Sequence, residues 1–252
     1  MKKEIYVVGI GPGEKDKMTH EAYKVLEKSD VIVGYTLYVE LVKEIFPDKE
    51  FLSTPMRQEI DRCRMCFDLA LEGKTVSLVC SGDAGIYGMA SPVLQLLSEV
   101  DEYKSVDFCV VPGITAAISG AAELGCPLNH DFCVISLSDL LTPWEAITRR
   151  LKAASNGDFA IALYNPSSHK RNDYLERACK ILMENGTSKN TAAGYVENIG
   201  RENTRTVVCT LAELMEARVN MFTTVFIGNS QSEIVELPDG NRKILTKRGY
   251  AL

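Results

Sequence analysis

Short apolar runs alternate with segments of helical periodicity over the first 113 residues. Residues 19–30, 36–46, 59–73 and 86–100 carry apolar side chains at intervals of three and four, which predicts amphipathic helices. Between these segments lie four strand-sized runs: IYVV (5–8), VIVG (31–34), TVSLVC (75–80) and VDFCVV (106–111). Such alternation predicts an α/β domain, with a mostly parallel sheet covered by helices on both faces.

The second half has a different pattern, which predicts a second α/β domain. Consecutive strands without a helix between them, such as the pair flanking ENIGREN (197–203), predict hairpins and therefore a mixed sheet. We place the domains at residues 1–113 and 114–252. No Gly/Ser linker marks this boundary, so we expect the two halves to share a cleft that holds the active site. The remaining strand candidates are FCVISLS (132–138), DFAIALY (158–164), TAAGYV (191–196), TRTVVCT (204–210) and FTTVFIG (222–228), and the helix candidates are residues 143–154, 171–186 and 211–217.

Charge and composition argue against nucleic-acid binding and against a membrane protein. A net charge of −6 argues against binding to nucleic acid, which requires a surplus of basic side chains. No apolar run approaches the roughly 18 residues that cross a bilayer, and glycine interrupts the first run before a signal peptide could form. We therefore expect a cytoplasmic protein with no membrane contact, whose eight cysteines are free, buried thiols.

The C-x-x-C pair of Cys63 and Cys66 is the one spacing typical of a metal site. A metal centre needs further ligands, and neither a second pair nor a nearby histidine supplies them. Helical spacing also places Ile60, Cys63, Phe67 and Leu71 on one apolar stripe. We therefore predict that the pair packs in the core and that the chain binds no metal.

The first run ends in GIGPG (9–13), a glycine loop that does not match the known phosphate motifs. A dinucleotide fold has G-x-G-x-x-G opening directly into a helix, whereas here the glycines are spaced G-x-G-x-G and GEKDKM intervenes. The P-loop motif is excluded by inspection. The loop either allows backbone to approach a ligand closely or is a plain tight turn.

Four further strands also end in loops of small residues. CSGDAGIYGMASP (80–92) contains Asp83, which either caps the following helix or contacts a ligand. The other three loops begin at PGITAA (112–117), NPSSHKR (165–171) and GNS (228–230). Ligands of open α/β sheets bind at the carboxyl ends of the strands, so these loops define one candidate site.

The ordered segments VGIGPG, SGDAGIYG, VVPGITAA and FTTVFIG resemble the tetrapyrrole methylases, which use S-adenosylmethionine (SAM). The likeness spans essentially the whole chain. Further segments resemble the branch that methylates C17 of precorrin-3B or cobalt-factor III and contracts the ring: VGYTLYVELV (33–42), MRQEIDRCR (56–64), ISLSDLLTPWEAITRRL (135–151), ALYNPSSHKR (162–171) and ENIGRENT (197–204).

The resemblance implies a two-domain fold, a homodimer and a set of SAM contacts. The SAM-binding residues that it implies are Pro12, Gly82, Asp83, Ile86, Tyr87, Thr115, Ala116, Tyr164, Asn165 and Thr224. Some relatives carry a C-terminal extension with an iron–sulfur cluster. This chain ends at Leu252 without one, so we expect no cluster.

Methyl transfer itself needs alignment more than acid or base groups, so we expect no single indispensable catalytic residue. Ring contraction does move protons, and the candidates for that role are Asp83, His169 and Glu197, with His130 and Tyr164 also considered. The alternative interpretation pairs Glu197 with Arg201 and treats the histidines as ordinary loop or turn residues. The tetrapyrrole carboxylates need basic partners, for which we select Lys170, Arg171 and Arg201, while Gly11 and Gly13 shape the substrate site.

Three alternatives remain at this stage. The chain could methylate another carbon of the same pathway, C11 or C20. It could be a nicotinamide-dependent oxidoreductase, although its second strand ends in Gly34 where such enzymes place an acidic residue. A non-enzymatic carrier of tetrapyrrole or cobalt is disfavoured by the lack of a metal-ligand cluster.

Overall fold

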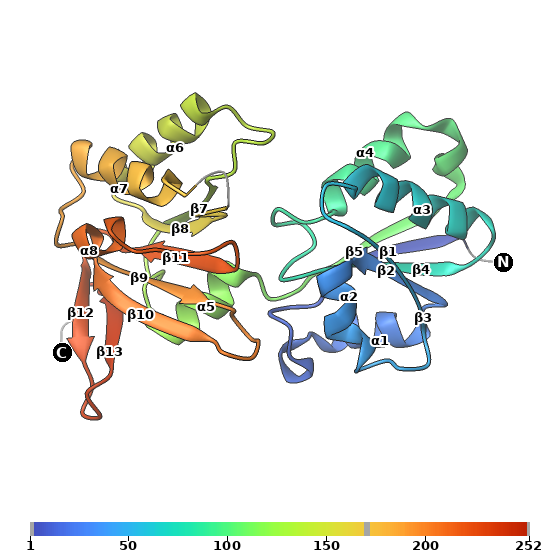
Figure 1. Cartoon of the computed structure of the whole chain (residues 1–252), viewed down its shortest axis with the longest axis horizontal. Helices are drawn as coiled ribbons and strands as arrows, with labels where there is room; N and C mark the ends of the chain where they lie inside the picture. Colours follow the sequence, from blue (N-terminus) through green and yellow to red (C-terminus); the bar gives the residue numbers. More distant parts are fainter. Residues whose placement is uncertain (1–2, 169–171, 251–252) are drawn as a thin grey trace. The chain divides into compact units, whose positions relative to one another are not determined.

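The computed structural model describes residues 3–168 and 172–250, which form two compact units, residues 1–116 and 117–252 (Figure 1). In the first unit, all strand pairings of the sheet are parallel, in the order β3-β2-β4-β1-β5. Its strands are β1 (Glu4–Gly9), β2 (Val31–Tyr35), β3 (Glu50–Thr54), β4 (Thr75–Cys80) and β5 (Asp107–Val111). Its helices are η1 (Lys15–Lys17), α1 (His20–Lys28), α2 (Thr36–Lys43), α3 (Glu59–Leu71), α4 (Ala90–Glu99) and η2 (Asp101–Ser105).

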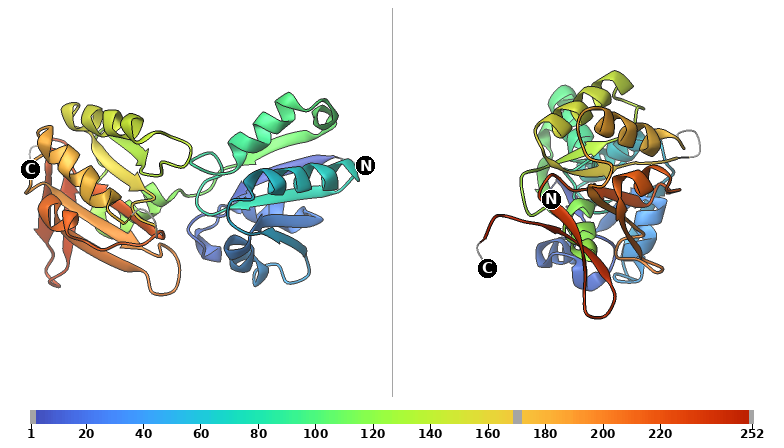
Figure 2. Two further views of the ribbon diagram at one scale, coloured as in Figure 1. Left: turned by 45° about the horizontal axis from the view of Figure 1, so that its top comes forward. Right: turned by 90° about the vertical axis from the view of Figure 1, so that its left-hand side faces the viewer.

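Helices cover both faces of this sheet, as predicted. Helices α1 and α2 lie on one face, and α3 and α4 lie on the other (Figures 1 and 2). Leu26 of α1 and Val42 of α2 pack in one apolar cluster, whereas Phe67 of α3 and Val93 of α4 pack in another. The inner strands β1, β2 and β4 lie between these two layers and are largely buried on both sides, which explains why they appear as continuous apolar runs in the sequence.

The second unit contains a mixed five-stranded sheet, also as predicted. Its order is β10-β9-β11-β8-β7, in which only the β7–β8 pairing is parallel. Helices α6 to α8 pack in its main core, and Gly120 of α5 faces Phe226 of β11. The elements are α5 (Ala116–Leu124), β7 (Phe132–Ser136), α6 (Trp144–Asn156), β8 (Ala160–Tyr164), α7 (Tyr174–Glu184), β9 (Ala192–Glu197), β10 (Arg205–Thr210), α8 (Leu211–Met215) and β11 (Thr223–Ile227).

The sequence patterns did not predict two features. Strand β3 lies at the edge of the first sheet, and a small third sheet, β12-β13-β6, forms in the second unit from β6 (Gly125–Cys126), β12 (Ser232–Glu236) and β13 (Arg242–Thr246). Helix α4 also begins at Ala90, four residues later than expected, because residues 86–89 belong to the preceding loop.

The cysteines are free, but two are exposed and Cys133 is half-buried, although all were expected to be buried. Cys109 lies on the edge strand β5 and Cys126 on β6, and both are exposed. The C-x-x-C pair does pack in the core as predicted, since Cys63 and Cys66 are both fully buried. Ile60, however, is 45% exposed and does not belong to the apolar stripe of α3.

We expect thiol reagents to distinguish these cysteines in the native protein. Burial raises the pKa of Cys63 and of Cys80 to about 12, so these thiols stay protonated at pH 8. The same burial keeps the reagent from reaching them. A mass-spectrometric time course with an alkylating reagent should therefore label Cys109 and Cys126 first and the buried thiols only after unfolding. Early labelling of Cys63 or Cys80 would contradict the packing of α3 against β4.

Candidate functional site

In the first unit, the loops after β1, β4 and β5 meet backbone against backbone at the carboxyl edge of the sheet. The amide N of Gly11 donates to the carbonyl O of Gly82 (3.0 Å), and the amide N of Gly82 donates to the carbonyl O of Gly11 (2.7 Å). A Cβ atom added at Gly113 would lie 2.1 Å from the carbonyl O of Gly82 and 2.6 Å from that of Gly9. We call these four residues, Gly9, Gly11, Gly82 and Gly113, the glycine junction.

The junction changes the interpretation of the GIGPG loop. The space beside Gly9 and Gly11 is filled by the chain itself, because an added Cβ would lie 2.7 Å from the carbonyl O of Gly82 or of Lys17, respectively. Gly11 and Pro12 are buried, and Gly13 is half-buried. Gly9 and Gly11 therefore allow these loops to pack closely against one another. Their role is to set the positions of the neighbouring loops.

Asp83 ties two of these loops together. Its Oδ1 accepts hydrogen bonds from the amide N atoms of Gly85 (2.8 Å) and Ile86 (3.1 Å), and its Oδ2 accepts one from Gly113 (3.0 Å). Helix α4 begins seven residues later, with Met89 at the N-cap position, so the helix-capping interpretation of Asp83 is wrong. The carboxylate instead closes a turn and connects the loop after β4 to the loop after β5.

Beyond this turn, two large apolar side chains are presented to solvent. Ile86 is 43% exposed and Tyr87 is 57% exposed. Tyr87 also has a φ of 54°, a left-handed conformation that costs an aromatic residue about 1 kcal/mol and is enriched at functional sites. Next to them, the backbone of Thr115 and Ala116 borders the glycine junction, since a Cβ at Gly82 would lie 3.6 Å from Ala116 N. The first unit thus brings its predicted cofactor residues together around Asp83.

A groove of about 440 Å³ adjoins the same turn. It lies between α4 and the edge strand β5, and it is lined by Gly85, Ala90, Ser91, Leu94, Gln95, Ser98, Phe108 and Val110. Leu94 is 52% exposed and Val110 is 39% exposed, so this surface is largely apolar. The sequence patterns predicted β5 and, apart from its start, α4, but did not indicate that these side chains are exposed.

In the second unit, one edge of the sheet gathers the remaining predicted cofactor residues. Strand β8 ends at Tyr164, and β11 runs antiparallel to it with Val225 opposite Leu163, which places Thr224 at the same edge. Thr223 pairs with Glu197 at the end of β9. Asn165 follows β8 with a φ of 54° and donates from Nδ2 to the Oγ atom of Ser136 (2.9 Å). Thr224 itself is buried, with 5% exposure.

The Tyr164 hydroxyl has a structural partner as well. It accepts a hydrogen bond from the amide N of Ala117 (2.8 Å) in the first turn of α5, where helical amides have no intrahelical acceptor. We expect Tyr164→Phe to lower the free energy of unfolding by about 1 kcal/mol, the typical cost of such a lost hydrogen bond. Chemical denaturation would measure this, with Tyr250→Phe, a substitution at an exposed tyrosine, as the control. Equal stabilities would show that solvent replaces the hydroxyl without loss.

Glu197 is paired differently from the expected arrangement. Its Oε2 lies 3.7 Å from Nη1 of Arg205 on the neighbouring strand β10, and its side chain is only 12% exposed. Arg201 instead stacks over the ring of Phe222, at 5.4 Å from the ring centre. The interpretation that Glu197 simply pairs with Arg201 is therefore wrong, although Arg201 lies only four residues after Glu197, which ends β9.

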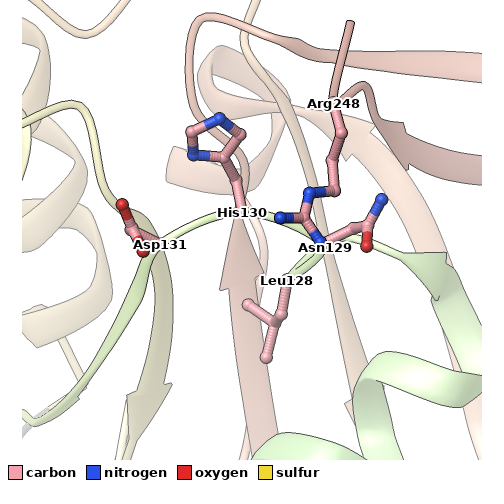
Figure 3. Close-up of a pocket in the computed structure, with 5 residues that line it drawn as sticks. All are labelled: Leu128, Asn129, His130, Asp131 and Arg248. Atoms are coloured by element: carbon pink, nitrogen blue, oxygen red, sulfur yellow. The ribbon is translucent and has the colours of Figure 1, made fainter. Parts of the chain in front are cut away.

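His130 lies at the opposite end of β7 from the sheet edge that carries Tyr164 and Asn165. It precedes β7, whose other end, Ser136, bonds to Asn165. His130 lines a polar pocket of about 340 Å³ with Leu128, Asn129, Asp131 and Arg248 (Figure 3). This location argues against a proton-transfer role beside Tyr164. The predicted residues His169, Lys170 and Arg171 lie outside the described part of the chain.

The sequence patterns also missed the buried cation Arg62, which is 4% exposed on α3. Its Nη2 donates to the carbonyl O of Pro55 (3.0 Å), its Nε donates to Oγ1 of Thr54 (2.9 Å), and its Nη1 lies 3.8 Å from Sδ of Met89. Arg62 thus links the loop after β3 to the residue that precedes α4. The sequence feature that indicated its burial was its position one helical turn before Cys66, on the buried face of α3.

Across residues 3–168 and 172–250, no group of three or more histidine, cysteine or acidic side chains is arranged to hold a metal ion. Within the same residues, none of the helices combines the length and the hydropathy that a bilayer span requires. The candidate site is therefore a set of backbone-rich loops with few charged groups, in each of the two units.

Comparison with known proteins identifies the class. A profile of the tetrapyrrole (corrin/porphyrin) methylases matches residues 4–215, and the chain belongs to this family. A Salmonella typhimurium protein named "Probable cobalt-factor III C(17)-methyltransferase" is 43% identical, over 98% of this chain and 99% of the relative. A Sinorhizobium precorrin-3B C(17)-methyltransferase is 37% identical, over 100% and 98%. The crystal structure of the methyltransferase CobJ has a TM-score of 0.85 at 35% identity, covering 92% of this chain and 96% of that one.

Proposed function

We propose that this methyltransferase uses SAM to methylate C17 of precorrin-3B or cobalt-factor III, with contraction of the macrocycle. The observation that carries the proposal is whole-chain similarity to relatives named for that reaction, at 43% and 37% identity. The loops of the described chain are consistent with it, because they present backbone and apolar groups and do not form a phosphate cradle.

The first unit fits SAM better than a dinucleotide. Strand β1 does not run directly into an α-helix: ten residues, which include the short η1, separate Gly9 from α1, which begins at His20. A pyrophosphate bound at a helix N-terminus would need that direct connection. Strand β2 ends in Gly34 and Tyr35 and leads directly into α2, with no acidic residue for a nicotinamide ribose. Both features disfavour the oxidoreductase alternative.

In this proposal, SAM supplies the methyl group from its sulfonium. The chain contributes alignment: Asp83 fixes the turn that presents Ile86 and Tyr87, and the glycine junction fixes Thr115 and Ala116 beside it. In the second unit we assign Tyr164, Asn165 and Thr224 to the same cofactor. Precise positioning of reactants can lower a barrier by about 7–11 kcal/mol in the best intramolecular systems.

We assign proton transfer during ring contraction to Glu197, which is the best placed of the acidic candidates. Its carboxylate is mostly shielded from solvent and lies at the edge that also carries Thr224 and Asn165. Asp83 is a weaker candidate because both of its oxygens already accept backbone hydrogen bonds. Arg201, Lys170 and Arg171 remain our proposed partners for the substrate carboxylates, with Gly11 and Gly13 beside the substrate.

Product analysis tests the proposal. Purified protein is incubated with SAM and either precorrin-3B or cobalt-factor III, and the products are examined by mass spectrometry and by NMR of a ¹³C-methyl label. A single added methyl at C17 on one substrate supports the proposal and identifies the metal state. A label at C11 or C20 would instead place the chain in another branch of the family. If neither substrate gains a methyl group, the proposed reaction is excluded.

We further propose a cytoplasmic homodimer. The apolar groove between α4 and β5, where Leu94 and Val110 are exposed, supports association of two copies. Sedimentation velocity of the wild type and of Leu94→Glu would test this. A monomeric wild type, or a dimer unaffected by the substitution, would contradict the proposed contact.

A further inference from the structure

The loop of residues 137–143, between β7 and α6, is anchored at several points. Asp139 accepts a hydrogen bond at Oδ2 from the hydroxyl of Tyr174 (2.5 Å), the first residue of α7. Trp144, the first residue of α6, packs on the ring of Tyr174 with the ring centres 4.5 Å apart. The guanidinium of Arg177 lies over both rings, 4.0 Å from the centre of the Trp144 ring and 4.9 Å from that of Tyr174. The loop is therefore held by the helices that it precedes.

Two leucines project from this anchored loop. Leu140 is 62% exposed and Leu141 is 98% exposed, the highest exposure among the large apolar side chains described. A fully exposed leucine forgoes the burial that makes apolar side chains stabilising. Because the flanking residues are fixed by Tyr174 and Trp144, this exposure is part of the folded structure. A contiguous exposed apolar pair of this kind marks a contact surface.

The loop also adjoins the predicted cofactor residues of the same unit. The amide N of Leu137 donates to the carbonyl O of Tyr164 (2.9 Å), and Nδ2 of Asn165 donates to Oγ of Ser136 (2.9 Å). Because β7 and β8 are parallel, the loops that follow them leave the same edge of the sheet. Leu140 and Leu141 are thus four and five residues after Ser136, the last residue of β7, and they follow closely on the two residues that bond to Tyr164 and Asn165.

We propose that Leu140 and Leu141 form an apolar platform that packs against the face of the tetrapyrrole macrocycle. This inference rests on the proposed function, and it assigns two substrate-binding residues that determine affinity for the ring. A tetrapyrrole is a flat, conjugated ring with carboxylates at its rim, so its face needs apolar contacts and its edge needs cations. Two leucines are suited to the face. A second copy of the chain is a poorer fit, because the proposed dimer contact lies at the groove between α4 and β5 of the first unit and not at this loop.

The test compares Leu140→Ser/Leu141→Ser with wild type. We expect the KM for the tetrapyrrole to rise about tenfold or more, because the removed contacts act on binding of the ring. The Kd for SAM, measured by calorimetry, and the melting temperature should stay unchanged, because both leucines are exposed in the free protein. Leu237→Ser, at a 39% exposed leucine in the turn between β12 and β13, is the matched control and should behave as wild type.

Three results would overturn the inference. An unchanged KM would show that the platform does not touch substrate. A weaker SAM affinity with unchanged KM would assign the loop to the cofactor, and conversion of a dimer to a monomer would assign it to an interface. The proposed function fails separately: in that case the wild type itself neither binds the tetrapyrrole, as followed by its visible absorption, nor methylates it.

Discussion

Gly113→Ala is expected to destabilise the first unit strongly and to abolish SAM binding. The new Cβ would lie 2.1 Å from the carbonyl O of Gly82 and 2.6 Å from the carbonyl C and O of Gly9, so backbone must move rather than a side chain. Moving Gly82 strains its paired hydrogen bonds to Gly11, and moving Gly113 lengthens its bond to Asp83. We expect a loss of about 3 kcal/mol, within the range for overpacking plus broken hydrogen bonds, and a melting temperature lower by roughly 10 °C.

The matched control is Gly85→Ala, in the same region. Its added Cβ would meet only Oδ1 of Asp83, at 3.3 Å, and Gly85 does not require a positive φ. Thermal unfolding and calorimetry with SAM should therefore separate the two variants clearly. Equal melting temperatures would show that the loops of the glycine junction can separate without loss of stability. The glycine junction would then not determine the positions of these loops.

Elements with strong periodicity were predictable, and elements defined by tertiary pairing were not. Strands β1, β2 and β4 are buried on both faces and therefore appear as uninterrupted apolar runs. Strand β3 is an edge strand of five residues whose first residue is exposed, so its pattern is weak. The hairpin of β12 and β13 did carry a local signal, the turn residues Pro238 to Asn241, in which Gly240 has a φ of 81° and Leu237 N donates to Asn241 O.

The position of the small-residue loops at the carboxyl edge of the first sheet was predictable, whereas the hydrogen bonds between them were not. Small residues after successive strands indicated the carboxyl edge of the sheet, and the structure does place Asp83 there. No local pattern, however, pairs Asp83 with Gly113, because 30 residues separate them. The same limit applies to Arg62, whose acceptors are Thr54, the last residue of β3, and Pro55, which follows this unpredicted strand. A charged residue in a segment of helical periodicity is ordinarily interpreted as exposed to solvent.

Asp83→Ala is expected to weaken SAM binding about a hundredfold and to destabilise the protein at the same time. Three backbone amides, those of Gly85, Ile86 and Gly113, lose a charged acceptor, and the turn that presents Ile86 and Tyr87 is no longer closed. Hydrogen bonds to charged groups contribute about 1.5–3 kcal/mol each when shielded, and because this carboxylate is partly exposed we expect about 2 kcal/mol in total. A matched surface variant is Asp101→Ala, which breaks only an exposed ion pair with Lys104 and should have little effect.

Asp83→Asn separates the two connections that the carboxylate makes. An asparagine side chain keeps one oxygen for Gly85 and Ile86, but its NH₂ group then faces the N–H of Gly113, where two donors oppose each other. If the link between the loops governs cofactor affinity, Asp83→Asn should retain most of the stability and still lose about tenfold in SAM affinity, measured by calorimetry at one temperature. Wild-type affinity in Asp83→Asn would show that the local turn alone suffices, and that the connection to Gly113 serves folding rather than binding.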